Sequence, residues 1–346
     1  MTVVGVAGAG TMGAGIAVLA SEQFSVRLYD PNTEALSEAP PGPEPVSDLD
    51  ALAGCDVVIE AAPEDLAVKR ELFGRLAEIV SPDCVLATNT SSLSVTAIAA
   101  EVPGPERVVG MHFFNPPAKM KLLEVVAGDR SDPEAVAVAR SVGEAIGKHV
   151  IEAADGPGFI VNRCNRPFSL EAMRIVQDGA ASFEEVDAAC RRAGFRMGPF
   201  ALMDLVGIDV GFAVAQSFYE QSFGEPRWRP SLLAARLVAS GRLGRKTGRG
   251  WYEYPPGPPR IEAADELDPI AERIVCQLVN EAYFALGEGV GSAEDIDAGM
   301  VLGLNHPRGP FAWGEHLGPA HVRGVLADLR ESGGDAYRPA PLLARH

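Results

Sequence analysis

The sequence predicts an α/β domain built on a parallel sheet, followed by a mostly helical second half. Residues 1 to about 155 alternate short apolar runs with helical stretches, an order typical of a parallel sheet whose strands are joined by helices. Gly156-Pro157-Gly158 then breaks this pattern, and helical periodicity follows it. The length of 346 residues allows two or three domains at about 150 residues each.

Short apolar runs bounded by turn residues mark the strands. We expect strands at residues 2–7, 25–29, 56–60, 85–88, 108–112 and 122–126. In the second half we expect helices at about 158–178, 183–193, 200–222 and 231–240. Ser182 and Glu185 have the spacing of a capping box, in which each side chain accepts a hydrogen bond from the backbone of the other residue. This pair predicts a helix start at residue 183.

A proline-rich break and an internal repeat divide the helical half. The run Pro255 to Pro259 is too rich in proline for a helix or a central strand, so we expect an extended linker there. A second copy of the preceding pattern follows: Ser182, Glu185, Asp187, Gly198-Pro199-Phe200 and Gly207 recur as Ser292, Asp295, Asp297, Gly309-Pro310-Phe311 and Gly318. The copy carries Glu272-Arg273 in place of Asn162-Arg163, so we expect it to serve packing and not chemistry. The predicted organisation is a sheet domain at 1–155, a helical module at 156–255, a linker at 256–264 and a second, degenerate helical module at 265–346.

Charge and cysteine usage exclude several classes of protein. The formal net charge of −17 disfavours nucleic acid and anionic membranes as partners. The five cysteines form no C-x-x-C pair, and no histidine cluster has zinc spacing. The first apolar segment is too short for a signal peptide or a membrane span. We therefore expect a cytoplasmic protein with reduced thiols, without a bound metal and without a membrane partner.

A glycine motif near the N-terminus predicts a dinucleotide site. Gly8, Gly10 and Gly13 match G-x-G-x-x-G between the first expected strand and a helix that runs to about residue 21, and Thr11 and Met12 lie within the motif. Such glycines allow a tight turn, close approach to a pyrophosphate and close packing of helix on strand. Asp30 follows the second strand, where a carboxylate accepts from a ribose 2′-hydroxyl and repels a 2′-phosphate. The motif therefore predicts a Rossmann-type domain that binds NAD in preference to NADP.

A histidine and a glutamate predict acid-base chemistry at the same sheet. His112 closes the run 108–112, and Glu124 lies in the next expected strand, beyond a turn at Pro116-Pro117 that can bring the two together. A carboxylate bonded to one imidazole nitrogen fixes the tautomer and leaves the other nitrogen to take a proton. Oxidation of an alcohol with NAD needs such a proton acceptor.

Six stretches along both halves carry a family signature: Gly8–Gly13, Asn89-Thr-Ser-Ser-Leu93, Met111-His-Phe-Phe-Asn-Pro116, Asp155-Gly-Pro-Gly-Phe-Ile-Val-Asn-Arg163, Met197-Gly-Pro-Phe200 and Gly244-Arg-Lys-Thr-Gly-Arg-Gly250. In these stretches the sequence resembles the L-3-hydroxyacyl-CoA dehydrogenase family. The resemblance implies a Rossmann domain followed by two all-α modules of the 6-phosphogluconate-dehydrogenase type. The third unit resembles the extra C-terminal module of larger family members.

The resemblance also implies roles for single residues. His112 would be the general base, with Glu124 orienting it, and Ser91 and Asn162 would hold the reacting oxygen and the thioester region. The cofactor site would be lined by Glu64, Lys69, Asn89, Asn115 and Lys246. Structural alternatives stay open: Ser91 as a helix cap, Asn162 as a solvated helix residue, and Glu64 with Lys69 as an exposed pair.

Two segments bear on the carrier of the acyl group. Family members insert a helical hairpin that helps to hold coenzyme A after the second strand, but residues 31–45 are short, rich in proline and without a basic residue. An acyl carrier protein is therefore an alternative carrier, as in relatives that act on hydroxyacyl or glyceryl units for polyketide biosynthesis. Arg242, Arg245, Lys246 and Arg249 form a basic cluster that could receive carrier phosphates, or be a solvated loop fixed by its glycines.

The leading hypothesis is an NAD-dependent 3-hydroxyacyl thioester dehydrogenase of fatty acid metabolism, acting on a 3-hydroxybutyryl-CoA-like substrate. A second interpretation is a dehydrogenase of a free hydroxy acid or sugar acid. A third, of another class, is a non-catalytic NAD-binding protein, against which the joint presence of Ser91, His112, Glu124 and Asn162 argues. Because the third unit can cover the surface through which family members dimerise, we expect a monomer or a small homo-oligomer.

Overall fold

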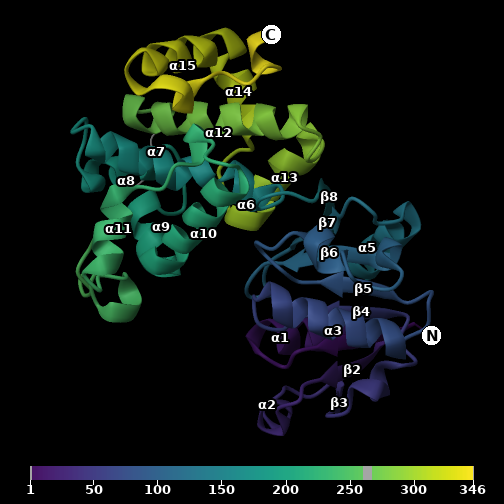
Figure 1. Cartoon of the computed structure of the whole chain (residues 1–346). Helices are drawn as coiled ribbons and strands as arrows, with labels where there is room; N and C mark the ends of the chain where they lie inside the picture. Colours follow the sequence, from purple (N-terminus) through teal and green to yellow (C-terminus); the bar gives the residue numbers. More distant parts are fainter. Residues whose placement is uncertain (1, 260–266, 346) are drawn as a thin grey trace. The chain divides into compact units, whose positions relative to one another are not determined.

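The computed structural model describes residues 2–259 and 267–345. The chain folds into two compact units, Met1–Phe159 and Ile160–His346. The first unit contains the sheet and the second is helical (Figure 1).

Unit 1 is built on an eight-stranded sheet of the order β3-β2-β1-β4-β5-β6-β7-β8. Its strands are β1 Val3–Ala7, β2 Ser25–Tyr29, β3 Glu44–Val46, β4 Val57–Glu60, β5 Val85–Thr88, β6 Val108–Phe113, β7 Leu122–Ala127 and β8 His149–Ala154. Neighbouring strands are parallel except for the antiparallel pair β6 and β7. The six expected strands are present within one residue at each end. β3 and β8 were not anticipated, and Pro45 in β3 is accommodated because β3 is an edge strand.

Helices cover both faces of this sheet. The α-helices of unit 1 are α1 Thr11–Ser21, α2 Thr33–Ser37, α3 Leu66–Ile79, α4 Val95–Ala99 and α5 Pro133–Ala145, and its 3₁₀ turns are η1 Leu49–Leu52 and η2 Pro105–Arg107. Side chains of α1 and α5 share one buried core with Val4, Ile59 and Met111 of the strands. α4 lies on the opposite face, where Val95 approaches Gly110, and α3 packs against α4. The sheet is therefore covered on both sides, which leaves the strand ends as the place for a site.

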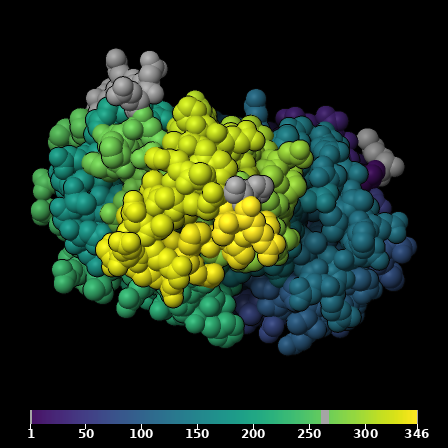
Figure 2. Space-filling model, turned by 90° about the horizontal axis from the view of Figure 1, so that it is seen from above, coloured from purple at the N-terminus to yellow at the C-terminus, as the bar shows by residue number. Residues whose placement is uncertain are grey.

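Unit 2 contains ten α-helices within its described residues. They are α6 Val161–Cys164, α7 Arg166–Gln177, α8 Phe183–Arg192, α9 Pro199–Val206, α10 Ile208–Gln221, α11 Leu232–Ala239, α12 Pro269–Gly287, α13 Ala293–Leu304, α14 Pro310–Leu317 and α15 Pro319–Gly333. The 3₁₀ turns are η3 Pro226–Trp228, η4 Arg245–Thr247, η5 Gly334–Tyr337 and η6 Leu343–Arg345. α12 is the central helix and packs against α7, α14 and α15 (Figure 1). Residues of the second copy, in yellow-green and yellow, form a continuous surface in Figure 2.

Two expected helices of unit 2 are broken. The stretch 158–178 divides into α6 and α7, because Pro167 in the first turn of α7 lacks the N–H that a continuous helix needs. The stretch 200–222 divides at Gly207, whose φ of 106° only glycine adopts readily. The capping box is confirmed, since the Ser182 side chain accepts from the Glu185 N–H and Glu185 accepts from the Ser182 N–H.

The internal repeat is confirmed by matching hydrogen bonds. Asp187 accepts from the backbone N–H groups of Phe200 and Ala201 at 2.8 and 2.9 Å. Asp297, its counterpart, accepts from Phe311 and Ala312 at 2.7 and 3.0 Å. In each copy the aspartate of one helix thus caps the helix that begins with Gly-Pro-Phe.

The two copies also exchange ion pairs. Arg163 of the first copy reaches Glu281 at 3.0 Å and Glu288 at 2.7 Å. Its counterpart in the second copy, Arg273, reaches Glu171 at 2.5 Å and Asp178 at 3.1 Å, the positions equivalent to those two glutamates. Such reciprocal contacts are what a two-fold axis produces between identical subunits. Within this chain the two modules therefore pack as pseudo-symmetric partners.

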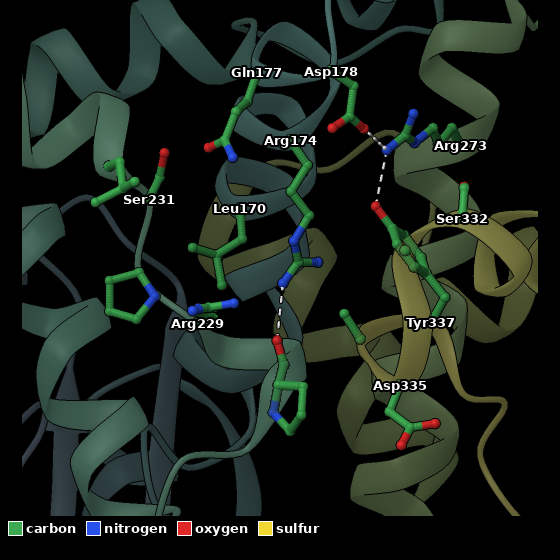
Figure 3. A pocket seen from close by; sticks show the side chains of 15 residues that line it. Leu170, Arg174, Gln177, Asp178, Arg229, Ser231, Arg273, Ser332, Asp335 and Tyr337 are labelled. Atoms are coloured by element: carbon green, nitrogen blue, oxygen red, sulfur yellow. Dashed lines mark hydrogen bonds and ion pairs between the residues drawn. The ribbon is translucent and has the colours of Figure 1, made fainter.

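A cavity of about 740 Å³ lies between the two modules of unit 2. Arg174, Arg229 and Tyr337 line it, and Arg273 bonds to Asp178 and Tyr337 at its wall (Figure 3). In the segments Trp228-Arg229-Pro230 and Tyr337-Arg338-Pro339 the two arginines correspond. Arg338 pairs with Glu225 at 2.8 Å, whereas the Arg229 guanidinium makes no hydrogen bond or ion pair with the described part of the chain. The two corresponding arginines thus have different surroundings in the two copies.

The expected proline-rich linker begins as a turn. Residues 254–256 are in a turn conformation, and the Gly257 N–H donates to the Glu253 carbonyl at 2.8 Å. The expected extended conformation is therefore wrong at this point, and residues 260–264 lie outside the described residues. The domain limits of 155, 255 and 264 remain predictions.

No single helix in the described ranges is long and apolar enough to cross a membrane, although the bent pair α9 and α10 passes that test together by length and composition alone.

Candidate active site

The candidate site residues of unit 1 gather at one edge of the sheet. Because β1, β2, β4, β5 and β6 are parallel, their carboxyl ends lie at the same edge. The glycine loop follows β1, Asp30 follows β2, Glu64 follows β4 and Ser91 follows β5, while His112 lies near the end of β6. Ligands bind at this edge in open α/β sheets.

The glycine loop has the geometry of a dinucleotide cradle. Gly8 has a φ of 119°, and a Cβ there would lie 2.6 Å from the carbonyl oxygen of Ala61. A Cβ on Gly13 would lie 1.8 Å from the Gly8 carbonyl oxygen, so helix and loop touch directly. Gly10 caps α1, and a Cβ there would meet nothing within 4 Å. The loop therefore leaves its open side at the positive end of a helix, as a pyrophosphate requires.

Asp30 ties the second strand to this loop. Its Oδ2 accepts from the Ala9 N–H at 2.8 Å, and its Oδ1 accepts from the Asn32 N–H at 2.8 Å. Each carboxylate oxygen has a second lone pair with which to accept from a ribose hydroxyl. The position of Asp30 and its free acceptor sites therefore fit the ribose of NAD.

His112 and Glu124 form a buried pair. They are register partners on the antiparallel strands β6 and β7, and His112 Nδ1 lies 2.6 Å from Glu124 Oε2. The side chains are 7% and 0% exposed. The pairing that the sequence predicted through a turn at the prolines is therefore present, and it leaves Nε2 as the nitrogen for proton transfer. The ring of Phe114, 4.6 Å away, packs beside the imidazole.

Glu64 holds the loop that carries Ser91. Its Oε1 accepts from the Thr90 hydroxyl at 2.7 Å and from the backbone N–H groups of Ser91 and Ser92 at 3.0 and 3.1 Å. Burial alone would raise the pKa of Glu64, but the hydrogen bond from Thr90, the charge of Lys69 and the bonds from the two serines outweigh it and lower that pKa. Glu64 is therefore an ionised acceptor that orders the loop.

Lys69 is not part of an exposed pair. Its side chain is 1% exposed, and its Nζ lies 2.6 Å from Glu60 and 3.5 Å from Glu64. Sequence reasoning missed Glu60, which is 0% exposed. The sequence signal for Glu60 was a charged residue directly after the apolar run 57–59, because a charge is buried only beside partners.

Two further contacts fix the same loop. Asn89 Oδ1 accepts from the Phe113 N–H at 2.9 Å, which joins the loop to the residue after His112. Asp155, also missed, accepts from the Ser94 hydroxyl at 2.6 Å and from the Thr96 N–H at 2.8 Å, so it caps α4. Asn115, two residues after Phe113, is exposed. The loop from Asn89 to Ser94 is thus held from both ends.

The remaining predicted site residues belong to unit 2 and are placed there by its own contacts. Asn162 lies half-buried in α6, where its carbonyl accepts from Arg166. Lys246 pairs with Asp209 at 2.6 Å, and Arg242 donates to the Gly250 carbonyl. Arg245 stacks 5.3 Å from the centre of the Tyr254 ring. Each cation of this loop that was predicted to bind cofactor or substrate is therefore engaged within the unit.

Among the described residues there is no group of three or more histidine, cysteine, aspartate or glutamate side chains that could hold a metal ion. The chemistry of the edge consists of the His112–Glu124 pair, the hydroxyl-rich loop and the glycine cradle.

Family comparisons cover both units. Residues 3–42 and 43–156 match the model of the 3-hydroxyacyl-CoA dehydrogenase, NAD binding domain. Residues 158–254 and 270–346 each match the 3-hydroxyacyl-CoA dehydrogenase, C-terminal domain. The first match is interrupted between residues 42 and 43, within the short segment between α2 and β3. The second is made twice, in agreement with the repeat.

Individual relatives agree with the family models. A 3-hydroxyadipyl-CoA dehydrogenase of Escherichia coli K12 is 37% identical, with 98% of this chain and 96% of the relative covered. That alignment runs over 456 positions, so the relative carries segments that this chain of 346 residues lacks. The crystal structure of 3-hydroxybutyryl-CoA dehydrogenase from Escherichia coli K12 superposes with a TM-score of 0.94 at 35% identity, covering 99% of this chain and 98% of that one.

A longer relative extends the comparison. The fatty acid oxidation complex subunit alpha of Shewanella sp. MR-4 is 35% identical over 83% of this chain, which spans 43% of that relative's length. Family models and relatives thus agree with an NAD-binding sheet unit followed by a repeated helical module. The chain belongs to the 3-hydroxyacyl-CoA dehydrogenase family of NAD-dependent oxidoreductases.

Proposed function

We propose that the protein interconverts an L-3-hydroxyacyl-CoA and its 3-oxoacyl-CoA, with His112 as the general base. The observation that carries the assignment of roles is the 2.6 Å contact between His112 Nδ1 and the buried Glu124 carboxylate. In the oxidising direction His112 Nε2 takes the proton of the C3 hydroxyl, and Glu124 stabilises the imidazolium that forms. NAD, when bound on the glycine cradle, supplies the acceptor for the C3 hydride. Ser91 and, from the family resemblance, Asn162 are the proposed contacts of the reacting oxygen and thioester.

The test is NADH formation with (S)-3-hydroxybutyryl-CoA. The native protein should turn it over with a KM between micromolar and about a millimolar. H112Q removes the titrating nitrogen and should lower kcat by about 10² to 10⁴, with the dissociation constant of NAD unchanged. Equal kcat for the variant and the native protein would contradict the role of His112.

A carrier protein is the second candidate for the acyl group. This alternative rests on the short segment between β2 and β4, which holds only the five-residue α2, the three-residue β3 and the turn η1. The interruption of the family match between residues 42 and 43 supports the absence of the hairpin that would hold coenzyme A. Hydroxyacyl or glyceryl groups on an acyl carrier protein, as in polyketide biosynthesis, would then be the substrates.

The two carriers are separated by a direct comparison. The same 3-hydroxybutyryl group is offered on coenzyme A and on a carrier protein, and kcat/KM is measured for each. A higher kcat/KM for the coenzyme A ester favours fatty acid metabolism, and turnover restricted to the carrier protein favours the biosynthetic role. Free 3-hydroxybutyrate is the third arm and tests the interpretation as a dehydrogenase of free acids.

We further propose a cytoplasmic monomer or small homo-oligomer. All five cysteines are free and buried, which fits a reducing compartment. The reciprocal pairs Arg163–Glu281 and Arg273–Glu171 support pairing of the two modules within one chain. Light scattering should give a mass near 36.5 kDa or a small multiple of it.

A further inference from the structure

We propose that Glu60 is a positioning residue for the loop that carries Ser91. The inference rests on the proposed function, in which Ser91 contacts the substrate. Glu60 is the last residue of β4, and its register partner Thr88 is the last residue of β5. Both side chains are 0% exposed, so Glu60 acts through other residues.

The Glu60 carboxylate accepts hydrogen bonds from three donors. Its Oε1 accepts from Lys69 Nζ and from the Ala62 N–H, both at 2.6 Å. Its Oε2 accepts from the Thr88 hydroxyl at 2.7 Å. A buried carboxylate and ammonium keep their charges only in such an arrangement, since each would otherwise carry a large desolvation penalty. Glu60 therefore fixes the position of the Lys69 ammonium.

Lys69 in turn orients Glu64. Glu64 Oε2 lies 3.5 Å from Lys69 Nζ, while its Oε1 accepts from Thr90, Ser91 and Ser92. One oxygen is thus turned to the lysine and the other to the loop. Two carboxylates share one ammonium, and the shorter contact belongs to Glu60. If Glu60 lost its charge, the ammonium would be drawn toward Glu64, and the bonds of Glu64 to the loop would change.

A second route leads from Glu60 to the same loop. Thr88 donates to Glu60 and accepts from the Thr90 N–H at 3.3 Å. Thr90 donates to Glu64 and accepts from the Leu93 N–H at 2.9 Å. The buried charge therefore reaches both sides of Ser91, through Lys69 and Glu64 on one side and through Thr88 and Thr90 on the other.

The test is a double-mutant cycle between Glu60 and Ser91. E60Q keeps the shape of the side chain but removes its charge. The amide oxygen can accept from Lys69, and the amide nitrogen can donate to the Thr88 hydroxyl. E60Q should lower kcat/KM for 3-hydroxybutyryl-CoA by about tenfold to a hundredfold, the cost of a small misplacement at a site. In the S91A background E60Q should cost less than about threefold, because the loop no longer presents the group that Glu60 positions.

A matched control separates positioning from stability. Arg107 is also buried in unit 1, but it precedes β6 at the opposite edge and bonds to the carbonyls of Ser81 and Ala77. R107M should lower the melting temperature and leave kcat/KM within about twofold. An equal loss of kcat/KM in E60Q and R107M at equal loss of stability would overturn the proposal.

T88V serves where E60Q does not fold. It removes one donor to Glu60 without touching a charge, and it should show a smaller loss of kcat/KM with the same dependence on Ser91. Additive effects of the Glu60 or Thr88 variant and S91A would overturn the positioning role while native turnover stands. If the native protein turns over none of the thioesters offered, the proposed function is contradicted. The double-mutant cycle is then measured on the dissociation constant of 3-oxobutyryl-CoA, and additive effects of the Glu60 and Ser91 variants on that constant would overturn the positioning role.

Discussion

We expect unit 2 to lose stability in mild acid because His306 is buried in it. His306 follows α13 in the second module, is 7% exposed, and packs against the rings of Phe168 and Phe195 of the first module at 5.5 and 5.0 Å. Burial lowers the pKa of His306 from 6.5 to about 4. The folded state therefore holds the imidazole neutral at a pH where the unfolded chain already binds a proton.

The sign and size of the effect follow from this difference. As the pH falls below about 6.5, only the unfolded state gains a proton, so the free energy of unfolding decreases until the folded state also binds one near pH 4. Between pH 8.0 and pH 5.5 the loss from His306 is about 1.4 kcal/mol, with an unfolded pKa of about 6.5. H306F abolishes the titration and keeps an aromatic ring in the same place.

The assay is urea unfolding followed by tryptophan fluorescence at the two pH values. The three tryptophans, Trp228, Trp251 and Trp313, all belong to unit 2, so the signal reports this unit. Between pH 8.0 and pH 5.5 the native protein should lose about 1.4 kcal/mol more unfolding free energy than H306F does. H316Q, at an exposed histidine of the same unit, is the control. A shift below about 0.5 kcal/mol would refute the assignment of a neutral buried imidazole.

Three further outcomes are expected. E124Q keeps the shape of the side chain but removes a charged hydrogen bond at His112, so kcat should fall by about 10-fold to 100-fold while NAD binding, measured by titration, is unchanged; a fall in NAD affinity alone would be inconsistent with the pairing. D30S removes the acceptor of the Ala9 N–H and the negative charge, so KM should rise for NAD and fall for NADP, and a parallel rise for both would contradict the role of the charge. R273M leaves Glu171 buried without its 2.5 Å partner and should destabilise unit 2 by about 3 to 5 kcal/mol in urea unfolding, with partial recovery in R273M/E171L. Arg174 at 3.2 Å and the Tyr337 hydroxyl at 3.1 Å also contact the Glu171 carboxylate, and a loss below about 1 kcal/mol would show that these two partners suffice.

Local chemistry determined much of this protein in advance. The glycine spacing needs a strand, a turn and a helix N-terminus, and β1, Gly8 and α1 provide them. The capping box is closed within four residues, so Ser182 and Glu185 specify it wherever the chain folds. The pairing of His112 with Glu124 followed from two adjacent strands joined at a proline turn. In each case the partners are near in sequence, and few alternative geometries satisfy them.

What depends on distant partners was decided only by the tertiary structure. The apolar run before Glu60 signals a buried charge but not its partners, because Lys69 and Thr88 come together with it only when β4, α3 and β5 are assembled. The basic cluster looked free in sequence, yet Lys246 finds Asp209 and Arg242 finds the Gly250 carbonyl after folding. The repeat showed two copies but not their reciprocal Arg163–Glu281 and Arg273–Glu171 pairs. Buried charges must be neutralised by whichever residues the fold places beside them, and sequence spacing does not encode which residues those are.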